Sequence, residues 1–376
     1  MFLVKNNISK FQNLTILYPI YILHDFDIIT FPWILFEFAE LFLYIFTIIY
    51  LLNGLYIGIT IRAFHKNLTT IFLFSMAQWF ELFVAKLMSW PYETGYWTLK
   101  GLFNETQLNV TLKQWYSRNQ NDMIPIILHQ SDYIFFISGF LKMHASMSLT
   151  TLLLLISIER SFACYYLNDY EKKSRIWIAV SLLSIGFVLN FIIAAIFYFN
   201  LLSMPLLIVL VLAPNIIGFN LIFYTRYWNQ KVTKTHEKFA NHSNYTLAAR
   251  FQAKENIKSF QMVQKVIIAG MGMVALGIIT AILLLWNTFP RLDNFFNLII
   301  QGEMSFTHLI VSMTIIYSVD SFRKVRLVNW ESIWIKFKVS RRKVAIIAVR
   351  KDSTVKTDII KKETETYFNQ LANSWT

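Results

Sequence analysis

Residues 133–160 read YIFFISGFLKMHASMSLTTLLLLISIER, an apolar run that ends abruptly in Glu159 and Arg160. About 20 apolar residues, each rising roughly 1.5 Å along a helix, span the ~30 Å hydrocarbon core of a bilayer. The run is long enough to predict a membrane-spanning helix. Because charged side chains are costly within hydrocarbon, the acid and the arginine at its end are expected at a membrane boundary.

The composition of the whole chain also indicates a membrane protein. Of its 376 residues, 56% are apolar and only 15% are charged, and the mean hydropathy is +0.46. An ordinary soluble domain has fewer apolar and more charged residues. The single cysteine, Cys164, excludes a disulfide within the chain. We expect this thiol to pack near the cytosolic boundary rather than to carry redox chemistry.

Seven apolar stretches predict an all-α fold, a bundle of seven transmembrane helices. They lie at about residues 31–61, 68–88, 132–158, 176–199, 204–228, 263–286 and 296–319. The predicted organisation has an extracellular segment at 1–30, the bundle at 31–319, an amphipathic juxtamembrane helix at 320–338 and a cytosolic tail at 339–376. The helix at 320–338 has an apolar stripe and a basic face, which favour an eighth helix lying in the membrane plane.

The distribution of Lys and Arg predicts the orientation of the bundle, because cytosolic loops retain positive charge. With the amino terminus outside, six of the 35 Lys and Arg residues fall in outer segments and 27 fall in inner ones. We therefore expect the amino terminus outside and the carboxyl terminus in the cytosol. Four Asn-x-Ser/Thr sequons would then be open to glycosylation, at Asn7, Asn13, Asn104 and Asn109.

Several motifs on the predicted inner side point to one family. They read FHKNL at 64–68, IERSFA at 158–163 with DYEK at 169–172, YTLAARFQAKENI at 245–257, and DSFR at 320–323. In these motifs the chain resembles the nematode serpentine receptor class e (Sre) chemoreceptors, a divergent seven-span G-protein-coupled receptor family. Span 6 has no proline and span 7 has no Asn-Pro pair, so the activation hinges of rhodopsin-like receptors cannot be transferred to this chain.

The resemblance implies a chemosensory receptor that binds a small molecule in the bundle and activates a heterotrimeric G protein at the cytosolic face. Its implied partners are the G protein, membrane lipid and an unidentified small-molecule ligand, with no cofactor, metal or nucleic acid. Its implied location is the plasma membrane, which includes the membrane of sensory cilia. The motifs predict a coupling surface formed by Tyr170, Arg250, Phe251, Glu255, Asn256 and Arg323.

Glu159 and Arg160 are the predicted coupling switch. An arginine at this boundary can hold an inactive state by pairing with an acid or a backbone carbonyl, and can move toward the G protein when the bundle opens. The alternative is a boundary charge that reaches out to water and only sets the depth of the helix. The residues alone leave both possibilities open, and the resemblance favours the switch.

Ionisable residues inside the spans are the candidates for a ligand pocket, since each needs a partner or a water-filled cavity. Lys142 and Glu303 lie at similar predicted depths in spans 3 and 7, and we expect them to pair and to flank the pocket. A purely structural ion pair is the alternative. The full set of pocket candidates is Lys142, His144, Glu303, His308 and Trp286.

The inner loop between spans 5 and 6 has helical spacing of Phe251, Ile257 and Phe260, so we expect it to extend both spans as helices. Its positive charge suits an acidic G-protein surface or, alternatively, anionic lipid.

Other functions have less support in the sequence. A phosphate-binding glycine loop, a Cys-x-x-Cys motif and a His-x-x-x-His pair are all absent, so an enzyme is not expected. Span 7 has no lysine for a retinal Schiff base. The remaining alternative is a ligand-gated cation channel or transporter of seven-span type, although such channels place the amino terminus inside.

Overall fold

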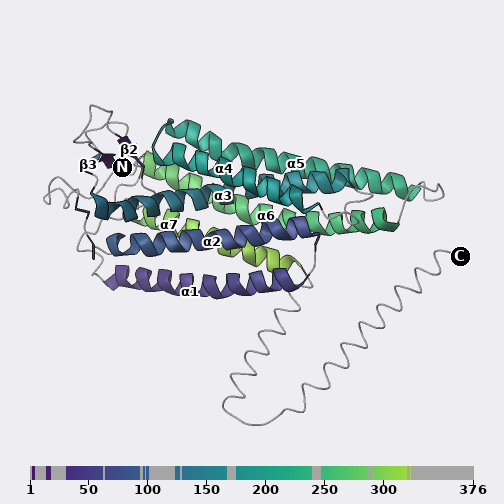
Figure 1. Cartoon of the computed structure of the whole chain (residues 1–376), viewed down its shortest axis with the longest axis horizontal. Coiled ribbons are helices and arrows are strands. Elements are labelled where there is room, and N and C mark those ends of the chain that lie inside the picture. Colours follow the sequence, from purple (N-terminus) through teal and green to yellow (C-terminus); the bar gives the residue numbers. More distant parts are fainter. Residues whose placement is uncertain are drawn as a thin grey trace, which may run out of the picture. The chain divides into compact units, whose positions relative to one another are not determined.

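The computed structural model describes residues 2–4, 14–17, 31–61, 64–93, 96–97, 99–100, 123–127, 129–166, 175–238, 247–286, 288, 292–319 and 322. Seven long helices lie within these ranges. They are α1 (Phe31–Thr60), α2 (Lys66–Glu93), α3 (Tyr133–Tyr165), α4 (Ile176–Tyr198), α5 (Met204–Lys238), α6 (Leu247–Leu285) and α7 (Asp293–Ser318). The prediction of a helical bundle is confirmed (Figure 1).

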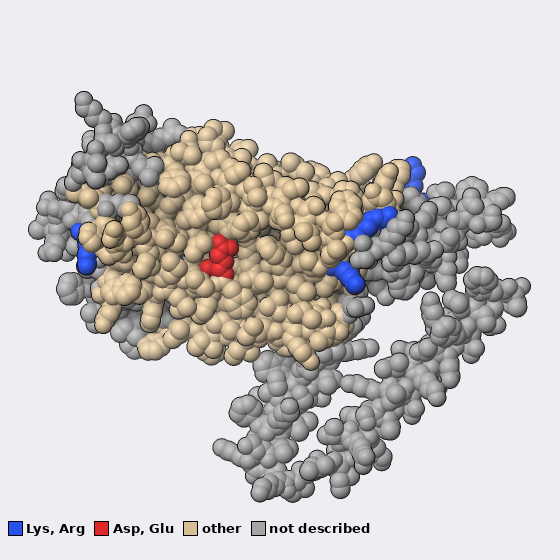
Figure 2. All heavy atoms as spheres, viewed as in Figure 1, with Lys and Arg blue, Asp and Glu red and all other residues tan. Residues whose placement is uncertain are grey.

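Six of these helices are long and apolar enough to cross a membrane, and α7 contains a shorter apolar segment, Ser305–Ser318. Many large apolar side chains on the helices are exposed, among them Phe42, Phe187 and Ile268. On the face that Figure 2 shows, the described Lys and Arg residues lie only toward the two ends, and the middle is uncharged apart from a small acidic patch. Such a surface suits a hydrocarbon environment.

Helix α3 is the central element of the bundle and packs against α2, α4, α5 and α6 (Figure 1). It buries small side chains along its length, and these allow neighbouring helices to approach closely. Helix α5 approaches α3 closely at Gly218, where an added methyl group would meet backbone atoms of Leu154. The hydroxyl of Ser157 donates a hydrogen bond of 2.8 Å to the carbonyl of Gly218 at the same crossing.

Helices α5 and α6 continue well beyond the predicted apolar stretches, to Lys238 and from Leu247. The prediction that the loop between them extends both spans as helices is therefore confirmed. Below, the end of the bundle at which Arg160 lies is called the Arg160 end, and the end at which α3 begins is called the Asp132 end.

A small sheet lies at the Asp132 end. Strand β1 (Phe2–Val4) pairs antiparallel with β2 (Leu14–Ile16) and parallel with β3 (Ile124–Ile126). The amide of Leu17 donates to the carbonyl of Tyr198 at the end of α4 (2.7 Å). Apolar side chains of the sheet pack with the ends of α2, α3 and α4 in one buried cluster, whose members include Ile16, Tyr92, Ile126, Phe135 and Tyr198. A short 3-10 turn, η4 (Gln130–Asp132), leads into α3.

Several predictions fall outside the described residues. They concern the four sequons at Asn7, Asn13, Asn104 and Asn109, the tail, and the eighth helix apart from Phe322. The coupling-surface residues Tyr170 and Arg323 also lie outside, as do the side chains of Arg250, Phe251 and Glu255.

Candidate functional site

Arg160 and Glu159 form a fully buried pair near the end of α3. Nε of Arg160 donates to Oε2 of Glu159 (2.6 Å), and Nη2 donates to Oε1 (2.8 Å). A two-pronged contact of this kind satisfies both carboxylate oxygens. An arginine that only set the depth of the helix would reach out to water, whereas this one has no exposed surface. The burial therefore argues against the simpler alternative.

The third guanidinium nitrogen of Arg160 connects α3 to α6. Nη1 donates to Oδ1 of Asn256 (3.3 Å) and to Oγ of Ser259 (3.1 Å). Both acceptors are neutral, and both side chains are completely buried. The guanidinium thus uses two nitrogens within its own helix and one to hold a neighbouring helix.

Polar contacts extend from Asn256 to α5. Nδ2 of Asn256 donates to Oδ1 of Asn229 (3.4 Å), and the thiol of Cys164 lies 3.6 Å from the same oxygen. The single cysteine thus has the packing position that the sequence predicts. We call Glu159, Arg160, Cys164, Asn229, Asn256 and Ser259 the arginine network. It joins α3, α5 and α6 at the Arg160 end.

A second buried group of charges lies toward the Asp132 end. Glu93 of α2 accepts from both Lys86 (2.6 Å) and Lys142, and Lys86 also pairs with Glu40 of α1 (3.0 Å). The hydroxyl of Ser89 donates to Glu93 as well (2.7 Å). We call these five side chains the lysine cluster. Its two lysines and two glutamates are balanced, as burial within a membrane bundle requires.

The predicted ion pair between Lys142 and Glu303 is wrong, because Lys142 pairs with Glu93 instead. The carboxylate of Glu303 lies against Gly277 of α6, where an added methyl group would overlap it. The apolar run that predicts span 2 ends at residue 88, which places Glu93 in the following loop. The helix continues to Glu93, two turns beyond Lys86 on the same face, which brings the carboxylate into the bundle.

The other pocket candidates lie in separate places. His144 is buried, its Nδ1 is 2.7 Å from Oε1 of Glu81, and its ring meets that of Phe187 edge to face. His308 is buried on α7. Trp286, at the end of α6, is 77% exposed and does not line either of the two pockets described in the bundle.

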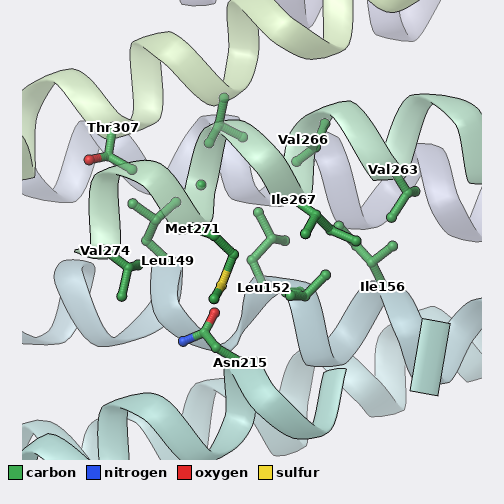
Figure 3. Close-up of a pocket in the computed structure, with 13 residues that line it drawn as sticks. Leu149, Leu152, Ile156, Asn215, Val263, Val266, Ile267, Met271, Val274 and Thr307 are labelled. Carbon is green, nitrogen blue, oxygen red and sulfur yellow. The ribbon is translucent and has the colours of Figure 1, made fainter. Parts of the chain in front are cut away.

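An apolar cavity of about 40 Å³ lies between α3, α5, α6 and α7 (Figure 3). Its walls are aliphatic side chains and Met271, and its polar atoms come from Asn215 of α5 and Thr307 of α7. Figure 3 shows the amide oxygen of Asn215 directed toward the Met271 side chain. Sequence analysis predicted neither Asn215 nor Met271 as a pocket residue, since a lone Asn or Met in an apolar run carries no directional signal.

Comparison with known proteins identifies the family. The family model described as Sre G protein-coupled chemoreceptor matches residues 4–376. This chain belongs to the Sre chemoreceptor family. It is 34% identical over 377 residues to serpentine receptor class epsilon-45 of Caenorhabditis elegans, with all of both chains covered. It is 25% identical over 376 residues to class epsilon-38 of the same organism, covering 96% of this chain and 98% of the relative.

The resemblance drawn from the inner-side motifs is therefore confirmed. Together with six helices that are long and apolar enough to cross a membrane, the family makes this Sre chemoreceptor an integral membrane protein of the receptor class. Three residues of the motifs that carry the resemblance lie together in the structure, since Arg160 contacts both Glu159 and Asn256. Ser259 and Asn229, which join them, were not predicted, because buried neutral polar residues look ordinary in a helical sequence.

Proposed function

We propose that this Sre chemoreceptor binds a small molecule inside its bundle and activates a heterotrimeric G protein at the Arg160 end, with that end in the cytosol of a sensory cell. The observation that supports this proposal is the arginine network. A completely buried guanidinium reaches α6 through hydrogen bonds to two neutral side chains, those of Asn256 and Ser259. Hydrogen bonds between a charged and a neutral group contribute about 1.5–3 kcal/mol each, less than the loss of a buried ion pair, so a ligand that favours the separated arrangement can part α3 from α6 there.

The decisive experiment removes the charge pair as a unit. Arg160→Ala alone would leave Glu159 buried without its cation, and such losses are strongly destabilising. The double variant Glu159→Gln/Arg160→Gln removes both charges and keeps the side chains similar in size. We expect near-wild-type surface level and loss of ligand-stimulated GTPγS uptake by co-expressed G protein, assayed against a panel of volatile and soluble compounds.

Arg175→Ala is the matched control. Arg175 is a further arginine at the Arg160 end, and its guanidinium lies 4.0 Å from the centre of the Tyr166 ring. We expect this variant to retain stimulated uptake. Unchanged uptake in the double variant, at equal surface level, would reduce the arginine network to a structural contact.

The orientation of the bundle is the second part of the proposal and has its own test. Because 27 of 35 Lys and Arg residues fall on one side of the predicted bundle, an epitope ahead of Met1 should be stained on intact cells. An epitope after Thr376 should be stained only after permeabilisation. The reverse pattern would favour a seven-span channel and would remove the G protein from the Arg160 end.

A further inference from the structure

The charges inside the bundle are not balanced at every position. Lys86 and Lys142 are neutralised by Glu40 and Glu93 within the lysine cluster. Glu303 of α7 is different, since within the described residues its carboxylate forms no ion pair and no side-chain hydrogen bond. A partly buried carboxylate in a membrane bundle is costly unless a cation or a donor accompanies it. At this position the bundle therefore has a carboxyl group without a cationic partner among the described residues.

Helical periodicity places Glu303 at one end of the apolar cavity. On α6 the cavity is lined from Val263 to Val274, and Gly277 follows Val274 by about one turn. On α7 it is lined by Val311 and Thr307, and Glu303 precedes Thr307 by about one turn. The contact between Glu303 and Gly277 shows that these next turns face one another. The carboxylate thus lies one turn beyond the cavity, on the side toward the Asp132 end.

The cavity can accept more than its present volume. At about 40 Å³ it is close to the ~30 Å³ that one water molecule occupies in the liquid. Its wall has spare room at Gly270, however, where an added methyl group would meet no atom within 4 Å. Met271 supplies a flexible side chain on the same wall, as Figure 3 shows. The apolar part of a small ligand can enter here with a change of rotamer.

We propose that the ligand of this receptor is an apolar molecule carrying a protonated amine. The ammonium group pairs with the Glu303 carboxylate, and the apolar body extends along α6 and α7 into the cavity beside Gly270 and Met271. This assignment rests on the proposed function, since it names the ligand class for the bundle site. An anionic ligand is disfavoured, because both lysines of the bundle already face glutamates.

The test compares amines with alcohols of the same carbon skeleton, beginning with 2-phenylethylamine against 2-phenylethanol and hexylamine against hexanol. Thermal unfolding of the purified receptor in nanodiscs reports binding without any G protein. We expect amines to raise the unfolding temperature and their alcohol partners to leave it unchanged. Glu303→Gln should weaken amine binding about 10- to 100-fold, and Glu303→Asp should retain part of it. Equal stabilisation by both members of each pair, or amine binding that survives Glu303→Gln, overturns the proposal.

Two glycine variants localise the apolar body. Gly270→Leu places a side chain in the cavity at a position where the added Cβ meets no atom within 4 Å, and it should abolish amine binding with Glu303 intact. Gly272→Leu is the matched control, because Gly272 also has open space around it but does not line the cavity. Equal effects of the two variants would contradict binding in the cavity. Stabilisation by sodium chloride alone that is lost in Glu303→Gln, with no added effect of amines, would assign the site to an inorganic cation and overturn the amine.

The outcomes also separate this inference from the proposed function. Amine binding that depends on Glu303, without any GTPγS uptake, would preserve the ligand assignment and remove the signalling role. Uptake stimulated by other compounds and insensitive to Glu303→Gln would preserve signalling and overturn the amine.

Discussion

The lysine cluster and the arginine network both bury charge along α3, but they connect helices in different ways. In the lysine cluster two of the ion pairs cross between helices, Lys86 with Glu40 and Lys142 with Glu93, so ion pairs themselves join α1, α2 and α3. In the arginine network the opposite charges are neighbours on one helix, and the acceptors described on α6 are the neutral side chains of Asn256 and Ser259. Separating the first set of helices would expose unpaired charges, whereas separating α3 from α6 would break hydrogen bonds from the guanidinium to neutral acceptors and leave its ion pair with Glu159 in place. The difference suggests a fixed part of the bundle, α1 to α3, and a movable contact at the Arg160 end.

The largest effect should come from breaking the lysine cluster. Glu93→Leu removes the carboxylate that Lys86 and Lys142 share, and leaves two buried lysines with Glu40. We expect the free energy of unfolding to fall by about 3–5 kcal/mol, measured by chemical unfolding in detergent together with surface level. The double variant Glu93→Leu/Lys142→Leu restores balance and should recover most of the loss. Additive damage in the double variant would show that Glu93 and Lys142 do not act as a pair.

Weakening the contact between α3 and α6 should have a smaller effect, and this effect should be a rise in basal activity. Asn256→Ala removes one of the two acceptors for Nη1 of Arg160, and we expect basal GTPγS uptake to rise about two- to tenfold. Asn256→Asp gives Arg160 an ionic partner on α6 and should lower basal uptake. A change in the same direction for both variants would refute the movable contact.

The smallest effect should come from Ser161→Ala. Its hydroxyl lies 3.0 Å from that of Thr225, so this contact joins α3 to α5 without Arg160. We expect basal uptake within about twofold of wild type, because a neutral, partly buried hydrogen bond contributes little. A rise as large as that of Asn256→Ala would mean that general loosening, rather than release of Arg160, controls activity.

Sequence reasoning placed the helices well because the length of an apolar run directly reports the thickness of hydrocarbon that it crosses. The same signal says nothing of helix beyond the hydrocarbon, which is why the extension of α2 to Glu93 was missed, whereas the extension of α5 to Lys238 was predicted from the helical spacing of the following loop. For this reason Glu93 was missed as the partner of Lys142. With the acid assigned to a loop, Glu303 was the best remaining partner for Lys142.

The arginine network was predicted only in part, for a related reason. A charged pair at the end of an apolar run is conspicuous, and Glu159 and Arg160 were found from it. The acceptors on α6 are determined by the rotation and depth of two helices relative to each other, and small polar residues such as Ser259 give no sequence signal of either. The orientation of the bundle stays a prediction from charge, as does the eighth helix, most of which lies outside the described residues.

The small sheet at the Asp132 end imposes an order on biogenesis. Translation makes Phe2–Val4 first, but the parallel partner of this strand, Ile124–Ile126, follows about 120 residues later. At roughly 5–20 residues per second, the first strand waits about 6 to 24 s for its neighbour. The contact from Leu17 to Tyr198 is completed later still. Phe2–Val4 therefore cannot complete its pairing until span 2 and the strand after it have been made, and the sheet cannot be joined to α4 until span 4 has been made.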